Sequence, residues 1–180
     1  ALGANVSGID VRSLDDSDAA TLVEAWAQYG VLFFRDQKLT PDEHLTFARR
    51  FGEIDINRFF TPVDGHPEIA QVLKEPDQEH NIGGGWHTDH SYDQIPAMGS
   101  MLYARQVPPV GGDTLFSSMT LAFEALSDGM KKTLLGLNAW HSSRHAFGYS
   151  VSDSEHYEDG RLAFQSDTSQ KFEAIKIFFS

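Results

Sequence analysis

Apolar residues near the start of the chain recur at helical spacing and predict two helices. The first covers residues 17–29, with Ser17 or Asp18 as its cap and Gly30 as its stop signal. The stripe of large apolar side chains in this helix predicts that one face packs against a core.

The second helix is predicted from its start signal. Residues 40–43 read Thr-Pro-Asp-Glu, which is a capping box with proline at the first helical position. Leu45, Ala48 and Phe51 follow at helical spacing and are predicted to face inward, and Gly52 ends the pattern.

Short apolar or alternating runs, separated by Gly and Pro turns, predict strands. These runs cover residues 31–34, 54–56, 69–73, 87–89, 98–104, 114–117 and 138–142. Helical turns are predicted at 121–126 and 128–135. Early helices around many short strands predict a mainly β fold, a sandwich with flanking helices.

Length and composition favour one domain over residues 1–180. The chain has 180 residues, of which 41% are hydrophobic, and this suits a globular domain with a sizeable core. Residues 75–85 form a polar, glycine-rich loop, which we interpret as a lid. Residues 150–170 are rich in Ser, Asp and Glu and show little periodicity, and a short apolar run, 172–179, follows.

Charge and cysteine content narrow the possible partners. The formal net charge of −12 argues against nucleic acid and anionic membrane as partners of the whole surface. No apolar run approaches the ~20 residues of a membrane span, and no signal-peptide pattern opens the chain. The chain has 0 Cys, which excludes disulfides and thiolate sites and permits a cytoplasmic location.

The strongest chemical signal is the sequence Gly-Gly-Gly-Trp-His-Thr-Asp at residues 83–89. On a strand, His87 and Asp89 would point to one face, and an imidazole with a carboxylate supplies two of the three ligands of a 2-His-1-carboxylate iron site. We expect Trp86 to pack beside the pair, and His90 to point to the opposite face. The polar loop before the glycines, and the glycines themselves, allow backbone to approach a ligand.

Other readings of this pair stay open. His-x-Asp is a weak motif alone, since the chain has 8 His residues and related His-x-Glu pairs occur at residues 66–68 and 156–158. A zinc hydrolase could use His87, Asp89 and His90, although neighbouring residues of a strand face opposite ways. A non-catalytic sandwich that binds a partner is the other alternative.

Several motifs in order resemble the TauD/TfdA family of Fe(II)- and 2-oxoglutarate-dependent dioxygenases. The similar segments are residues 2–10, 29–41, 47–52, 83–89 and the Gly-Gly-Asp-Thr-Leu-Phe sequence at 111–116. The resemblance runs from about residue 2 to about residue 147, and residues 150–180 match poorly. It implies a double-stranded β-helix (jelly-roll) fold, apparently incomplete at the C-terminus.

The same resemblance implies a function and several site residues. His87 and Asp89 would bind Fe(II), and Thr114 would help to hold the co-substrate 2-oxoglutarate. The enzyme would use O2 to hydroxylate a small organic acid, a sulfonate, sulfate ester or aryloxy or alkyl carboxylate, with release of succinate and CO2. A homo-oligomer is possible for such a domain.

The substrate segment departs from that of taurine-cleaving relatives. Those relatives carry a His and a Tyr where this chain has Asn57 and Phe60, and an Asn where it has Gly83. The sulfonate and the amine of taurine would both lose polar partners, at a cost of about 1–3 kcal/mol per group. Taurine is therefore not the expected substrate. The candidate pocket residues are Asn57, Phe60 and Tyr92, with Arg58 and His66 also considered.

The third metal ligand is not evident in the sequence. The resemblance places the second metal-binding His, and the Arg that pairs with 2-oxoglutarate, in a later segment than this chain contains. His141, His145 and His156 are the in-chain alternatives. The expectation is an incomplete family member with little activity of its own, or a truncated, non-catalytic one that binds a metal or ligand.

Overall fold

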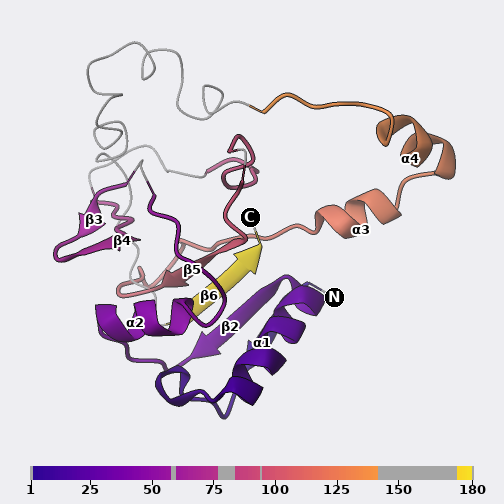
Figure 1. Cartoon of the computed structure of the whole chain (residues 1–180). Coiled ribbons are helices and arrows are strands. Elements are labelled where there is room, and N and C mark those ends of the chain that lie inside the picture. The colour runs from indigo at the N-terminus through magenta and orange to yellow at the C-terminus, as the bar shows by residue number, and fades with distance from the viewer. Residues whose placement is uncertain (1, 58–59, 77–83, 94, 142–173, 180) are drawn as a thin grey trace.

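The computed structural model describes residues 2–57, 60–76, 84–93, 95–141 and 174–179, the last as backbone. Helices and strands are mixed in this part of the chain, rather than the mainly β arrangement that the sequence predicts (Figure 1). In order along the chain, the elements are β1 Ala4–Val6, η1 Val11–Ser13, α1 Asp16–Tyr29, β2 Val31–Arg35, α2 Pro41–Ala48, β3 Pro62–Val63, β4 His66–Ala70, β5 Gly99–Tyr103, α3 Met119–Glu124, α4 Asp128–Leu134 and β6 Ala174–Phe179.

Strands from both ends of the chain form one mixed sheet. Its order is β1-β2-β6-β5; β1 and β2 are parallel, and β6 is antiparallel to both of its neighbours. The apolar run at residues 172–179, to which the sequence assigned no element, therefore supplies the strand that joins β2 to β5. A separate hairpin pairs β3 with β4.

One face of the sheet is covered by α1 and α2 and contains the core. The buried cluster joins two strand residues, Leu32 and Phe34, to side chains of the helices and of the η1 turn. Aromatic edges meet faces within it, since the Phe34 and Phe47 rings lie 5.6 Å apart at 81°. The remaining members are Val11, Leu22, Trp26 and Phe47. Leu32 is 0% exposed, so this contact between β2 and the helices excludes water.

The first two helices are confirmed, with small shifts at their ends. Asp15, rather than Ser17 or Asp18, caps α1 by accepting a bond from the Asp18 N–H at 2.8 Å, so the helix begins one residue earlier. Gly30 has φ +72 and donates its N–H to the Trp26 carbonyl, which ends α1 as predicted.

The capping box of α2 forms as predicted, but the helix is shorter than its apolar pattern. Thr40 accepts from the Glu43 N–H, and the Glu43 carboxylate accepts from the Thr40 N–H. The helix ends at Ala48, where i to i−3 bonds tighten the last turn, and Phe51 lies beyond it. Leu45 is buried as predicted, and Phe51 packs against the core from beyond the helix, whereas Phe47 is buried in place of Ala48.

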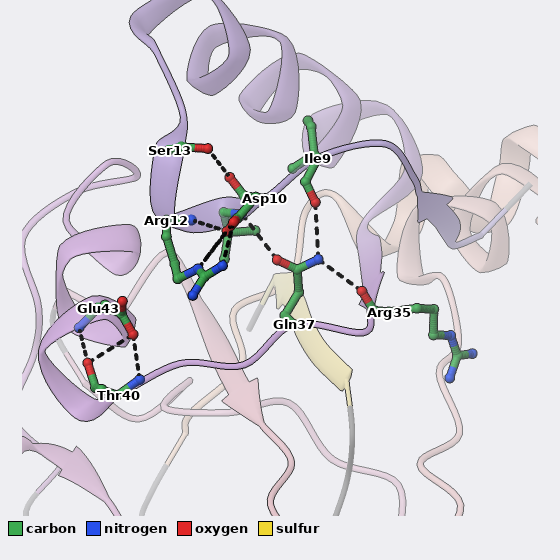
Figure 2. Close-up of polar contacts among 9 residues, drawn as sticks. Ile9, Asp10, Arg12, Ser13, Arg35, Gln37, Thr40 and Glu43 are labelled. Atoms are coloured by element: carbon green, nitrogen blue, oxygen red, sulfur yellow. Dashed lines mark hydrogen bonds and ion pairs between the residues drawn. The ribbon is translucent and has the colours of Figure 1, made fainter.

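The side chain of Gln37 ties together the segments that enter and leave the core (Figure 2). Its Oε1 accepts from the Val11 N–H at 3.1 Å, and its Nε2 donates to the carbonyls of Ile9 and Arg35 at 3.1 and 2.9 Å. The Tyr103 hydroxyl of β5 donates to the Gln37 carbonyl and accepts from the Leu39 N–H. These bonds join the η1 turn, β2 and β5 before α2 begins.

Several predicted strands are not strands in the described structure. Residues 31–34 and 98–104 form β2 and β5, and the 69–73 run is shifted into β4, but residues 54–56, 87–89, 114–117 and 138–141 take no strand conformation. A strand needs a neighbour to pair its backbone groups, and short alternating runs in the sequence do not reveal one. The turns at 121–126 and 128–135 are confirmed as α3 and α4.

No helix in the described part of the chain is both long and apolar enough to cross a membrane.

Replacement of Gln37 by glutamate is expected to destabilise the fold. In Gln37→Glu, the Nε2–H donor is lost and an oxygen faces the carbonyls of Ile9 and Arg35. The free energy of unfolding should fall by about 1–3 kcal/mol in urea titrations. Gln71→Glu makes the same chemical change at an exposed position and is the control. An equal loss in both variants would contradict a bridging role for Gln37.

Two histidines are expected to give stability opposite dependences on pH. Burial against Tyr103 lowers the pKa of His44, so its contribution is present above its ordinary value of 6.5 and is lost as pH falls. The Asp64 carbonyl and then Asp42 raise the pKa of His66, so its contribution is present below 6.5 and is lost as pH rises through the folded value.

Urea midpoints between about pH 5 and pH 8 measure both contributions. His44→Phe should lose less stability than the unmodified protein on acidification, whereas His66→Asn should lose less on alkalinisation. Parallel pH profiles for all three proteins would show that neither histidine is linked to folding.

Candidate metal centre

The predicted metal-binding pair comes together in a loop rather than on a strand. His87 Nε2 lies 3.2 Å from Asp89 Oδ1, and the two side chains are 53% and 31% exposed. The predicted strand at 87–89 is therefore wrong, although the convergence that it was meant to explain is present. The chain bends at Gly85 and again at residues 89–90, and the His87 ring turns back toward the Gly85 carbonyl.

The hydrogen bonds of His87 leave two acceptors facing each other. His87 Nδ1 lies 2.8 Å from the Gly85 carbonyl, and a carbonyl can only accept, so Nδ1 carries a hydrogen. In the neutral ring, Nε2 then has a lone pair directed at a carboxylate oxygen, which is also an acceptor. A proton or a metal ion between these atoms resolves the conflict.

This geometry fits a divalent metal bound by both residues. Imidazole nitrogen and carboxylate oxygen bind such metals at about 2.1 Å, so two ligands at a right angle lie about 3 Å apart. A bond from the second ring nitrogen to a carbonyl is the usual way in which a metal-binding histidine is oriented. Within the described ranges, however, no third His, Asp or Glu joins the pair.

A residue of the sheet contacts the second carboxylate oxygen of Asp89. Ser100 of β5 donates its hydroxyl to Asp89 Oδ2 at 3.4 Å, a long bond that orients the carboxylate. Sequence reasoning missed Ser100. Its only signal was its place in the strand predicted at 98–104, one residue from Met101, which faces the core.

Strand register places the Thr114 segment on the same face of the sheet as this pair. Phe33 pairs with position 176, which in turn pairs with Leu102, so Phe33 and Leu102 share a face with Ser100. Phe116 packs on Phe33 with ring centroids 6.3 Å apart. Both segments thus lie on the face opposite the helices.

Thr114 itself is exposed and is not in the strand that the sequence predicts. Gly111 and Gly112 before it both have positive φ, +84 and +76, so the chain turns at consecutive left-handed residues. The role of Thr114 toward 2-oxoglutarate stays a prediction.

His90 does not join the pair, as predicted. Its Nδ1 lies 2.8 Å from Asp93 Oδ2 and its Nε2 lies 3.3 Å from Asn57 Nδ2. Among the described residues, no cluster of His87, Asp89 and His90 suited to a metal is present. The zinc-hydrolase alternative therefore has no ligand set here.

Two of the candidate substrate residues, Asn57 and Tyr92, contact this histidine. Asn57 contacts it directly, and the Tyr92 ring lies 5.6 Å from the His90 ring at 34°. Phe60 is half-buried, three residues beyond Asn57. Arg58 and Gly83 lie outside the described residues, and so do most of the loop predicted as a lid and two of the alternative metal ligands, His145 and His156.

The remaining candidates are placed elsewhere or differently from the prediction. His66 of β4 contacts Asp42 of α2 at 3.1 Å, and Glu68 contacts Arg49, so this His-x-Glu pair supports the helix. His141 Nδ1 lies 2.9 Å from Ser91 Oγ and is not grouped with the metal pair. Trp86 is 72% exposed, because residues 84–88 all lie at the surface, and the predicted packing is absent from the described structure.

A protein-family model matches almost the whole chain. The family model described as "Taurine catabolism dioxygenase TauD, TfdA family" matches residues 1–177. The chain belongs to the TauD/TfdA family. The match extends past residue 147, where the resemblance seen in the motifs ended, and includes most of β6.

The names of the TauD/TfdA relatives of this chain contain different substrates. It is 33% identical to an (S)-phenoxypropionate/alpha-ketoglutarate-dioxygenase of Delftia acidovorans, with 91% of the chain and 58% of the relative covered. It is 32% identical to an alpha-ketoglutarate-dependent sulfonate dioxygenase of Saccharomyces cerevisiae, with 79% of the chain and 37% of the relative covered. The chain thus spans about half the length of relatives that it matches.

A solved structure supports the same fold. The structure of a taurine dioxygenase from Burkholderia xenovorans matches with a TM-score of 0.69 and 25% identity, and 99% of this chain and 77% of that chain are covered. The described arrangement of sheet and helices is therefore that of a TauD-type dioxygenase.

Proposed function

We propose that the protein carrying this chain is an Fe(II)- and 2-oxoglutarate-dependent dioxygenase that hydroxylates a small organic acid. The observation that carries the proposal is the pair of acceptors, His87 Nε2 and Asp89 Oδ1, facing each other at 3.2 Å. Family membership supplies the metal and co-substrate that suit this donor set. We also propose that the domain folds as a double-stranded β-helix.

The residues of this chain would act by orientation. The Gly85 carbonyl holds the His87 ring with Nε2 outward, and Ser100 holds the Asp89 carboxylate. Thr114 would donate its hydroxyl to 2-oxoglutarate. Bound together, iron(II) and 2-oxoglutarate would activate O2, with release of succinate and CO2. The third ligand would come from outside the described residues.

We further propose that the substrate is an aryloxy or alkyl carboxylate, a sulfonate or a sulfate ester, rather than taurine. Asn57 and Phe60 replace the His and Tyr of taurine-cleaving relatives, and the Asn57 amide is already bonded to His90. Aromatic rings at positions 60 and 92 are half-buried and suit an aryl or alkyl group. The relatives named above support both phenoxyalkanoate and sulfonate substrates. No comparison supports the non-catalytic alternative.

Metal binding is tested by spectroscopy of the full-length protein. Anaerobic addition of Fe(II) and 2-oxoglutarate should give a weak visible charge-transfer band, and His87→Ala and Asp89→Ala should each remove it, because each deletes a ligand. His66→Ala removes a histidine that is paired with Asp42, away from the site, and should keep the band. A band that survives both ligand substitutions would refute the assignment.

Substrate class is tested by succinate formation. With Fe(II), 2-oxoglutarate and O2, we expect 2-phenoxypropionate, an alkanesulfonate or an alkyl sulfate to stimulate succinate release more than taurine does. The reason is that the charged ends of taurine lack the partners found in taurine-cleaving relatives. A parallel reaction with a metal chelator gives the background. Efficient sulfite release from taurine would show that the substrate assignment is wrong.

A further inference from the structure

The turn directly after the metal pair has an unusual backbone. His90 has φ +54, a left-handed conformation that a residue with a Cβ rarely adopts. The Asp93 N–H donates to the His90 carbonyl at 2.9 Å and closes the turn. Residues other than glycine keep a left-handed backbone conformation only where surrounding contacts hold them, and such residues are concentrated at functional sites.

The contacts of the His90 ring indicate which of its nitrogens carries a hydrogen and which accepts one. Asp93 accepts at 2.8 Å from Nδ1, which therefore carries the hydrogen, and Nε2 accepts from the Asn57 amide at 3.3 Å. The His90 and Asp93 side chains are 15% and 19% exposed, so solvent competes little for these bonds. The neutral ring is satisfied on both sides, unlike that of His87.

The turn thus links three segments that are distant in sequence. Asn57 is one of the substrate residues predicted from the sequence, Asp89 precedes the turn directly, and Ser91 contacts His141 at 2.9 Å. A shift of His90 would move the Asn57 side chain and the peptide next to Asp89 together. The link consists of two side-chain hydrogen bonds, one from each distant segment to the turn.

We propose that His90 is a positioning residue for the substrate: it holds Asn57 in a fixed place relative to the Asp89 carboxylate, and so aligns the substrate with the metal. This proposal rests on the proposed dioxygenase function. His90 would not contact the iron or the reacting atoms. Its effect would pass through Asn57, which would set the substrate position, and its loss would leave the metal pair assembled.

The test is a double-mutant cycle in the full-length protein, with the best substrate from the succinate assay above. His90→Ala and Asn57→Ala remove the same hydrogen bond from opposite sides, and Asn57→Ala leaves the turn at 90–93 intact. Each should raise the KM for the substrate by about fivefold, the typical worth of one hydrogen bond. The double variant should add little to either single change.

Two readouts separate positioning from general damage. The anaerobic charge-transfer band with Fe(II) and 2-oxoglutarate should persist in both variants, because His87 and Asp89 remain. The ratio of succinate to hydroxylated product should rise, since a misaligned substrate escapes oxidation while 2-oxoglutarate is still consumed. His66→Ala, which breaks another His–Asp contact on the helix side, should change neither quantity.

The outcomes distinguish the inference from the function on which it rests. Absence of metal-dependent 2-oxoglutarate turnover in the unmodified protein would refute the proposed function itself. If turnover is present, independent KM effects that multiply in the double variant, or an unchanged succinate-to-product ratio, would overturn the role of His90. Loss of the charge-transfer band in Asn57→Ala would also overturn it, because the metal pair would then depend on Asn57.

Discussion

The alternation of side chains along β5 connects the core to the candidate site. Met101 and Tyr103 face the helices, and Tyr103 bonds to backbone atoms of the segment that leads into α2. Ser100 lies on the other face and holds Asp89. Because successive residues of a strand point in opposite directions, the packing of one face fixes the position of the other. The packing of β5 on the core therefore fixes the position of Ser100, which contacts the Asp89 carboxylate.

That attachment depends on a strand from the far end of the described chain. Residues 174–179 pair with β2 on one side and β5 on the other, so β2 and β5 lie two strand spacings apart, about 10 Å. The segment that carries Phe116 and the loop that carries Asp89 then meet the same face from two strands. Order in the sheet, rather than nearness in sequence, places the motifs at 87–89 and 111–116 on the same face.

Sequence reasoning predicts what is encoded locally and misses what depends on a distant partner. The Thr40 capping box, the stop at Gly30 and the strand at 31–34 are local signals, and all are present. The strand at 174–179 requires two partners more than 70 residues away, which no local pattern reveals. The predicted strands at 87–89 and 114–117 are wrong because a short alternation does not reveal whether a neighbouring strand is present to pair its backbone groups. The pair His87 and Asp89 could still be chosen from the motif, whereas Ser100 could not.

Two histidines three residues apart show why the partner, rather than the residue type, decides the role. Both rings have a hydrogen on Nδ1, as their acceptors require. At His90 the second nitrogen meets an amide donor, so the ring is complete and acts as a structural link. At His87 the second nitrogen meets a carboxylate, and the ring is complete only when a cation lies between them. The same loop therefore presents one histidine that organises its neighbours and one whose second nitrogen faces a place for a proton or a metal ion, and this difference follows from hydrogen-bond chemistry without reference to the family.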